Sequence, residues 1–152
     1  MLLSALLFLS QPALAVDSKT LPGSACQPTT STYAANLVIS KGAIYNSSTT
    51  SSIKVVCPII DDTSGDLDYT YLYVYDGHST SAIECNLYSR DISSAATGDS
   101  DSDSSTGTGS QTLTFLDVGG TAGDYYQYLE CTIPAKGTSY SYIYGYYAHE
   151  ED

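Results

Sequence analysis

The segment DYTYLYVYD at residues 68–76 decides the fold, because tyrosine recurs at every second position, at Tyr69, Tyr71, Tyr73 and Tyr75. Side chains alternate across a β-strand, so these tyrosines lie along one face and the aliphatic residues between them take the other. A second segment, SYSYIYGYYA at residues 139–148, repeats the pattern with Tyr140, Tyr142, Tyr144 and Tyr146. Each segment is therefore predicted to be a strand with an aromatic stripe.

Strand patterns recur along the rest of the chain, whereas no stretch keeps a helical apolar period for three turns. The candidate strands, separated by glycine-rich and aspartate-rich turns, are residues 31–40, 42–46, 52–59, 68–76, 82–90, 110–117, 125–133 and 139–148. About eight short strands at this spacing predict an all-β fold, an antiparallel β-sandwich of the immunoglobulin-like or jelly-roll type.

The four cysteines are predicted to form two disulfides, because their number is even and the chain carries an export signal described below. They are Cys26, Cys57, Cys85 and Cys131. The last three alternate in step with aliphatic residues, which places them on core-facing strand faces. Pairing Cys26 with Cys57 and Cys85 with Cys131 is preferred, since the first bridge would pin the N-terminal segment to a core strand. The other two connectivities remain open.

The N-terminal run MLLSALLFLSQPALA at residues 1–15 ends in a small-residue pattern typical of a signal-peptidase site. We expect residues 1–15 to be a signal peptide, residues 16–30 an extended arm and residues 31–152 the β-sandwich domain. The run is too short for a comfortable membrane span and no second apolar stretch follows, so the protein is predicted to be secreted, extracellular or at the cell surface.

The charge balance excludes two classes of partner. Five basic and seventeen acidic residues give a formal net charge of −12. Such a protein repels the phosphates of nucleic acids and anionic membrane surfaces. Neither nucleic acid nor membrane is expected as a partner.

Two low-complexity segments, residues 46–52 and 93–110, are predicted to be exposed loops, because neither can bury apolar area. The second contains alternating carboxylates at Asp99, Asp101 and Asp103, the ligand type that calcium prefers. It lacks the turn glycine and the closing glutamate of a calcium loop, so these residues are weak metal candidates. The first begins with Asn46-Ser47-Ser48, an acceptor sequence for N-linked sugar.

No catalytic constellation stands out in this sequence. Its two histidines, His78 and His149, lie in a turn and in the acidic tail, and no serine occupies a nucleophile elbow. Glycosidases use a pair of carboxylates, but any acidic chain contains such pairs, so their presence does not indicate a glycosidase here. We therefore expect no enzyme activity and no cofactor.

The tyrosines are the candidate contact residues. The chain has fifteen tyrosines, two phenylalanines and no tryptophan, and one core cannot bury all of these tyrosines. Rigid amphipathic rings on a strand face can stack on sugar rings or form protein contacts. Part of one ladder is expected to pack inside the sandwich. Three further tyrosines alternate with core residues and are expected at the surface: Tyr88, Tyr126 and Tyr128.

A family resemblance rests on short motifs spread over the chain after residue 20: LPGSACQ at 21–27, GAIYN at 42–46, VVCPI at 55–59, IECNL at 83–87 and LECTIP at 129–134. Together with the tyrosine-rich final strand, they resemble a group of uncharacterised exported bacterial proteins with one four-cysteine β-sandwich. Some of that group form extracellular filaments, so the resemblance implies a structural role and no catalytic residues.

Two functional hypotheses follow. The first is a subunit of a homopolymeric filament or surface assembly, in which the arm at residues 16–30 adds a strand to the open sheet edge of a neighbour and the tyrosines supply further contacts. The alternative is a carbohydrate-binding or adhesive module whose exposed tyrosine faces hold glycans.

Overall fold

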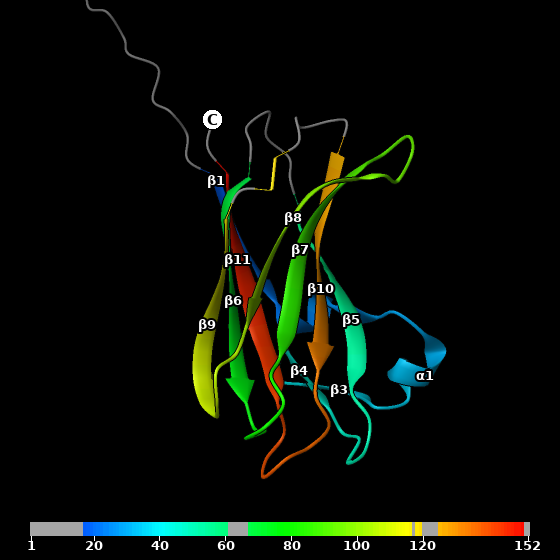
Figure 1. Cartoon of the computed structure of the whole chain (residues 1–152), viewed down its shortest axis with the longest axis vertical. Helices are drawn as coiled ribbons and strands as arrows, with labels where there is room; N and C mark the ends of the chain where they lie inside the picture. Colours follow the sequence, from blue (N-terminus) through cyan, green and yellow to red (C-terminus); the bar gives the residue numbers. More distant parts are fainter. Residues whose placement is uncertain (1–16, 61–66, 117, 120–124, 151–152) are drawn as a thin grey trace, which may run out of the picture.

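A computed structural model describes residues 17–60, 67–116, 118–119 and 125–150. The predicted signal peptide, residues 1–15, lies outside these ranges. Within them the chain forms short strands and two short helices (Figure 1): β1 (Asp17–Pro22), the 3₁₀ helix η1 (Gly23–Ala25), β2 (Gln27–Pro28), α1 (Ser31–Ala34), β3 (Leu37–Ser40), β4 (Ala43–Asn46), β5 (Ile53–Pro58), β6 (Leu67–Asp76), β7 (Glu84–Asp91), β8 (Thr97–Ser104), β9 (Gly109–Leu116), β10 (Tyr125–Ile133) and β11 (Tyr142–Glu150).

The strands form two antiparallel sheets that pack face to face, as predicted. One, which we call sheet A, has the order β3-β4-β11-β6-β9, with β1 also paired to β11. The other, sheet B, has the order β2-β5-β10-β7-β8. The prediction of an all-β antiparallel sandwich with two disulfides is confirmed.

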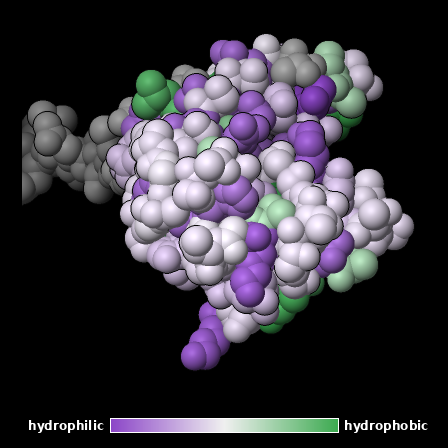
Figure 2. Space-filling view, turned by 60° about the horizontal axis from the view of Figure 1, so that its bottom comes forward, coloured by the Kyte–Doolittle hydropathy of each residue, from purple (hydrophilic) through white to green (hydrophobic). Residues whose placement is uncertain are grey.

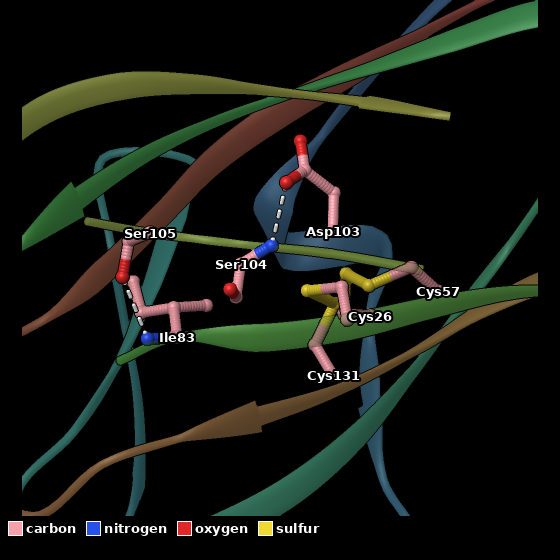
Figure 3. Close-up of a disulfide and its surroundings, with 8 residues drawn as sticks. Cys26, Cys57, Ile83, Asp103, Ser104, Ser105 and Cys131 are labelled. Atoms are coloured by element: carbon pink, nitrogen blue, oxygen red, sulfur yellow. Dashed lines mark hydrogen bonds between the residues drawn. A yellow bond between two sulfur atoms is a disulfide. The ribbon is translucent and has the colours of Figure 1, made fainter. Parts of the chain in front are cut away.

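The core lies between the sheets and follows the alternation of the sequence. Along β5, for example, Ile53, Val55 and Cys57 are buried while Lys54 is exposed. The disulfides join Cys26 to Cys57 and Cys85 to Cys131, which is the preferred pairing. The first bridge fastens the N-terminal segment to the buried face of β5 (Figure 3).

The predicted N-terminal arm is part of the sandwich. Within residues 16–30, β1 pairs with β11 in antiparallel register and β2 pairs with β5. The Lys19 ammonium lies 3.1 Å from the buried Glu150 carboxylate, which adds an ion pair to the β1–β11 ladder. The prediction that this segment donates a strand to a neighbouring subunit is wrong, because both of its strands pair with strands of its own chain.

The acidic segment 93–110, predicted to be a loop, contains strand β8, which pairs with β7. Two of its three aspartates turn toward sheet A: Asp101 Oδ2 accepts a hydrogen bond from the Leu116 backbone N–H, and Asp103 Oδ2 accepts one from that of Thr114, both at 2.8 Å. Since β8 and β9 are the edge strands of opposite sheets, these bonds close one flank of the sandwich.

A β-bulge in β11 interrupts the second tyrosine ladder. Tyr142 and Ile143 pair with Tyr75 and Val74, but the next residue of β6, Tyr73, pairs with Gly145, so Tyr144 is an extra residue. Gly145 is required there, because a Cβ at this position would lie 2.7 Å from the Leu21 carbonyl oxygen of β1. The bulge reverses the alternation beyond it.

Tyr146 therefore points into the core, where it is fully buried and its hydroxyl donates a 2.7 Å hydrogen bond to the Pro58 carbonyl. The prediction that Tyr146 shares a face with Tyr140, Tyr142 and Tyr144 is wrong for this reason, although burial of part of one ladder was expected.

Candidate functional site

The outer face of sheet A carries an array of aromatic side chains from three strands and the segment before β11. We call it the tyrosine face and define it by Tyr45, Tyr69, Tyr71, Tyr73, Tyr75, Tyr140, Tyr142, Tyr144, Tyr147 and His149. Tyr73 and Tyr144 are its most open members, with exposed fractions of 44 and 47%. The predicted ladder on β6 lies on this face in full, because its residues alternate with buried Leu72 and Val74.

At one end of the tyrosine face the rings pack in contact with one another. The Tyr45 centroid lies 4.7 Å from that of Tyr140 and 5.0 Å from that of Tyr142. Tyr142 stacks in turn on Tyr144, with centroids 5.9 Å apart and planes only 5° apart, and meets Tyr75 edge-on. Mutual contact holds each ring in one orientation, which lowers the entropy cost of binding against them.

A hollow of about 630 Å³ opens beside these rings. It is lined by Ser40, Lys41, Ala43, Tyr75, Ser139, Tyr142 and Tyr144. Figure 2 shows this end of the sandwich mostly in pale tints of intermediate hydropathy, with small separate green and purple areas. Aromatic planes combined with hydroxyl groups suit a ligand that has both apolar faces and polar edges.

Two phenols of this face have raised pKa values. Burial raises the pKa of Tyr142 above its ordinary value, and the neighbouring Tyr45 and Tyr144 add to this rise. Burial likewise raises the pKa of Tyr69, with a further contribution from Tyr147. At neutral pH these two rings therefore present O–H groups that both donate and accept hydrogen bonds.

At the other end of the tyrosine face, Tyr69 contacts two residues that the sequence did not indicate as contact residues, Tyr147 and His149. Tyr69 stacks on His149, with centroids 4.5 Å and planes 12° apart. Tyr147 lies 6.1 Å from Tyr69, and its hydroxyl donates to Ser18 Oγ at 2.8 Å. The glycine in SYIYGYYA was the available signal, since a glycine inside a strand often marks a bulge and hence a change of face.

Sheet B carries a smaller aromatic group on its own outer face, formed by the predicted surface residues Tyr88, Tyr126 and Tyr128. Tyr126 stacks on Tyr128 at 6.0 Å, and Tyr88 lies 5.4 Å from Tyr128. Arg90 Nε donates a 2.9 Å hydrogen bond to the Tyr128 hydroxyl, and its guanidinium lies 5.2 Å from the Tyr88 ring centroid. The two sheets thus place their tyrosines on opposite sides of the molecule.

The weak metal candidates have structural contacts instead. Asp101 and Asp103 bind the backbone of β9, and Asp99 accepts a hydrogen bond from the next backbone N–H, that of Ser100. Across the described ranges, no three histidine, cysteine or carboxylate side chains come together in a way that could hold a metal ion.

Asn46, the candidate glycosylation site, lies in the interior. Its Nδ2 atom donates to the carbonyls of Ser51, Ile133 and Pro134 at 2.8 to 3.1 Å, and the side chain is fully buried. An N-linked sugar would attach to that same nitrogen, so the folded chain offers no acceptor there.

His78 and Asp76 do not form an acid–base pair. His78 Nδ1 accepts hydrogen bonds from the backbone N–H groups of Thr80 and Ser81, while the buried Asp76 carboxylate accepts bonds from the hydroxyls of Ser105 and Ser141. Both side chains thus serve local structure.

No helix in the described part of the chain is long and apolar enough to cross a membrane.

Comparisons with known proteins identify the fold but not a family. No protein-family model and no curated protein matches the chain, so the resemblance to exported four-cysteine proteins gains no support from sequence. Among solved structures, the chain is similar to the CBM36-1 domain of a multidomain xylanase from the hindgut metagenome of Trinervitermes trinervoides, with TM-score 0.53, 10% identity, and 90% of this chain and 98% of that one covered.

Two further structures share the fold. The xylan-binding module CBM86 from Roseburia intestinalis has TM-score 0.52 and 10% identity, covering 90% of this chain and 96% of that one. A family two carbohydrate esterase from Cellvibrio japonicus has TM-score 0.50 and 6% identity, covering 91% of this chain but 35% of that one. Similarity at this level of identity establishes a sandwich of the carbohydrate-binding-module type.

The filament hypothesis is therefore wrong, and its alternative is the better supported of the two. The similar structures are mainly carbohydrate-binding modules, not filament subunits. The segment that was to link neighbouring subunits also pairs within its own chain.

Proposed function

We propose that this protein is a secreted, non-catalytic carbohydrate-binding module that holds a polysaccharide chain against the tyrosine face of sheet A. The observation that carries the proposal is the hollow lined by Tyr75, Tyr142 and Tyr144. There a stacked ring pair, an edge-on ring and serine hydroxyls converge on one open surface. Sugar rings have apolar faces for stacking and equatorial hydroxyls for hydrogen bonds, which is the combination this surface offers.

The ligand should be uncharged. A net charge of −12 repels uronates and sulfated glycans at long range. The polar groups that line the hollow are the hydroxyls of tyrosine and serine, apart from Lys41 at its rim. A neutral chain avoids the cost of desolvating a charge on such a surface.

The fold supports a plant cell-wall polysaccharide as the first ligand to test. The CBM36-1 domain belongs to a xylanase, and the CBM86 module is described as a low affinity xylan-binding module. Both are similar to this chain over at least 90% of its length. The two disulfides suit the oxidising extracellular setting in which such polysaccharides occur.

Affinity electrophoresis in gels containing soluble xylan, followed by calorimetry, tests the proposal. Tyr144→Ala should weaken binding about tenfold, which corresponds to about 1.4 kcal/mol, because it removes the most exposed ring beside the hollow. Tyr126→Ala, on the opposite sheet, removes a ring of similar exposure (44%) and is the matched control that should leave affinity unchanged.

The outcomes separate the alternatives. Retardation by xylan or another neutral polysaccharide that Tyr144→Ala weakens and Tyr126→Ala leaves unchanged supports the site. Equal loss in both variants would show that binding is not confined to the tyrosine face. Absence of retardation across neutral polysaccharides, with a folded protein, would overturn the proposed function.

A further inference from the structure

Tyrosine is the main oxidisable side chain that this fold exposes. The chain has fifteen tyrosines, no tryptophan, and a single methionine at position 1. All four cysteines are joined in disulfides, so none offers a thiol. Thiols and methionine are ordinarily the first targets of oxidants. One-electron oxidants that reach this protein therefore act chiefly on its phenols.

Two of these phenols from distant parts of the chain lie close enough to react with each other. Tyr45, on β4, and Tyr140, in the segment before β11, have ring centroids 4.7 Å apart and planes inclined by 46°. This is the shortest separation between tyrosine rings in the described part of the chain. The centroids of two directly bonded phenol rings are only slightly closer, so coupling requires the two rings to turn their edges toward each other and not to approach from a distance.

The same cluster offers a route from solvent to this pair. Tyr144 is 47% exposed and can be reached by an external oxidant. It stacks on Tyr142, whose centroid lies 5.0 Å from that of Tyr45. Loss of an electron at Tyr144 can therefore pass through contacting rings to Tyr45, next to Tyr140.

We propose that Tyr45 and Tyr140 form an intrachain dityrosine cross-link when the protein is exposed to a haem peroxidase with hydrogen peroxide. Each phenol loses one electron and its hydroxyl proton, and the two radicals join through their ortho carbons. The hydrogens on those carbons then move to the oxygens and restore both phenols. The net loss is two electrons and two protons, which reduce one hydrogen peroxide to two water molecules.

The bond would strengthen the shortest ladder of β11. β4 meets β11 through two residue pairs, Tyr45 with Tyr142 and Ile44 with Ile143, whereas β1 and β6 pair with β11 over longer stretches. A covalent link between Tyr45 and Tyr140 would fasten this junction beside the hollow. The inference concerns ring geometry and stands apart from the proposed glycan binding.

Tryptic peptides of the full chain give a direct test. Cleavage after Lys41, Lys54 and Lys136 releases residues 42–54, whose single tyrosine is Tyr45, and residues 137–152, which contain Tyr140. Neither peptide contains cysteine, so the disulfides cannot join them. After peroxidase treatment and isolation of monomer, the two peptides should appear as one species lighter than their sum by two hydrogens, with dityrosine fluorescence. Recovery of both peptides unjoined from the oxidised monomer would overturn the proposal.

Phenylalanine variants assign the bond, because they keep each ring and remove the reactive phenol. Tyr45→Phe should eliminate the joined species. Tyr140→Phe should lower its yield several-fold, leaving coupling to Tyr142 as the residual route. Tyr126→Phe, on sheet B, should leave the yield unchanged. An unaltered yield in Tyr140→Phe would show that Tyr140 is not the partner, and circular dichroism verifies that each variant is folded.

Discussion

Tyr144 and Tyr146 are two positions apart in the same alternating segment, yet because of the bulge their replacement by alanine should affect stability to very different extents. Tyr146 is fully buried, so Tyr146→Ala should destabilise the fold by about 3 to 5 kcal/mol through lost burial and the cavity that remains. Tyr146→Phe keeps the ring and loses the hydrogen bond to Pro58, at a cost of about 1 kcal/mol. Tyr144→Ala removes a half-exposed ring and should change stability by no more than about 0.5 kcal/mol.

Urea unfolding of the disulfide-bonded protein, followed by far-ultraviolet circular dichroism, measures these differences. An unchanged dependence of the unfolding free energy on urea concentration would show that the variants share one unfolding transition. Binding to soluble xylan should respond in the reverse order, with Tyr144→Ala weakened and Tyr146→Phe unaffected. Equal destabilisation by Tyr144→Ala and Tyr146→Ala would refute the bulge, because it would place both rings in comparable environments.

Three further predictions follow from other contacts. Reduction of the two disulfides should lower the free energy of unfolding by about 2 to 5 kcal/mol per bridge, measured by urea unfolding with and without reductant, and a smaller loss would mean that the bridges add little to the packed core. Replacing Asp101 and Asp103 together with serine frees two backbone N–H groups on edge strand β9, so sedimentation should reveal concentration-dependent self-association that is absent from the matched Asp99→Ser variant; monomeric behaviour of the double variant would argue against this protective role. Burial raises the pKa of Tyr146 to about 12, above its ordinary value near 10, so its contribution to stability is complete below about pH 10 and is lost as the pH rises toward 12; Tyr146→Phe should flatten this alkaline decline in the melting temperature, and an identical decline in both proteins would assign it to other groups.

Much of the fold follows from local alternation that the sequence shows directly. The buried positions of β5, β7 and β10 fall at every second place and, apart from Ser89 and Gln127, are aliphatic residues and cysteines; each predicted core cysteine is buried. Burial on one face imposes this pattern on any half-buried strand, so it can be read without knowing the partner strands. The ladder on β6 was recognised for the same reason.

β8 escaped prediction because no apolar residue marks its inner face. Its alternation is of aspartate and serine, and two of the aspartates turn inward to accept backbone hydrogen bonds from β9. What holds the inner face of this segment in place is its hydrogen bonding to backbone N–H groups of the neighbouring strand β9, and the sequence does not show which strand will be its neighbour.

The candidate site was predictable in its residue type and less so in its membership. Tyr75, Tyr142 and Tyr144 were identified from their spacing, whereas Tyr45 and Tyr147 join the tyrosine face through strand pairing and through the bulge. Asn46 was included wrongly, because the glycosylation motif gives no information about the three backbone carbonyls in the interior that accept hydrogen bonds from its side-chain amide.

The serine and aspartate alternation of β8 also leaves that strand without a unique register of its own. Sliding it by two residues along β7 would place Asp99 and Asp101 where Asp101 and Asp103 now stand, with the same side chains facing β9. What fixes its position is Ser105, whose buried hydroxyl accepts a hydrogen bond from the Ile83 N–H and donates one to Asp76 (Figure 3 shows the first of these). Because Ser105 fixes one end of β8, insertion or deletion of two residues in the Asp–Ser repeat would preserve the alternation of its side chains. The length of β8 can therefore change during evolution, since the next aspartate along the chain would then make the hydrogen bonds to sheet A.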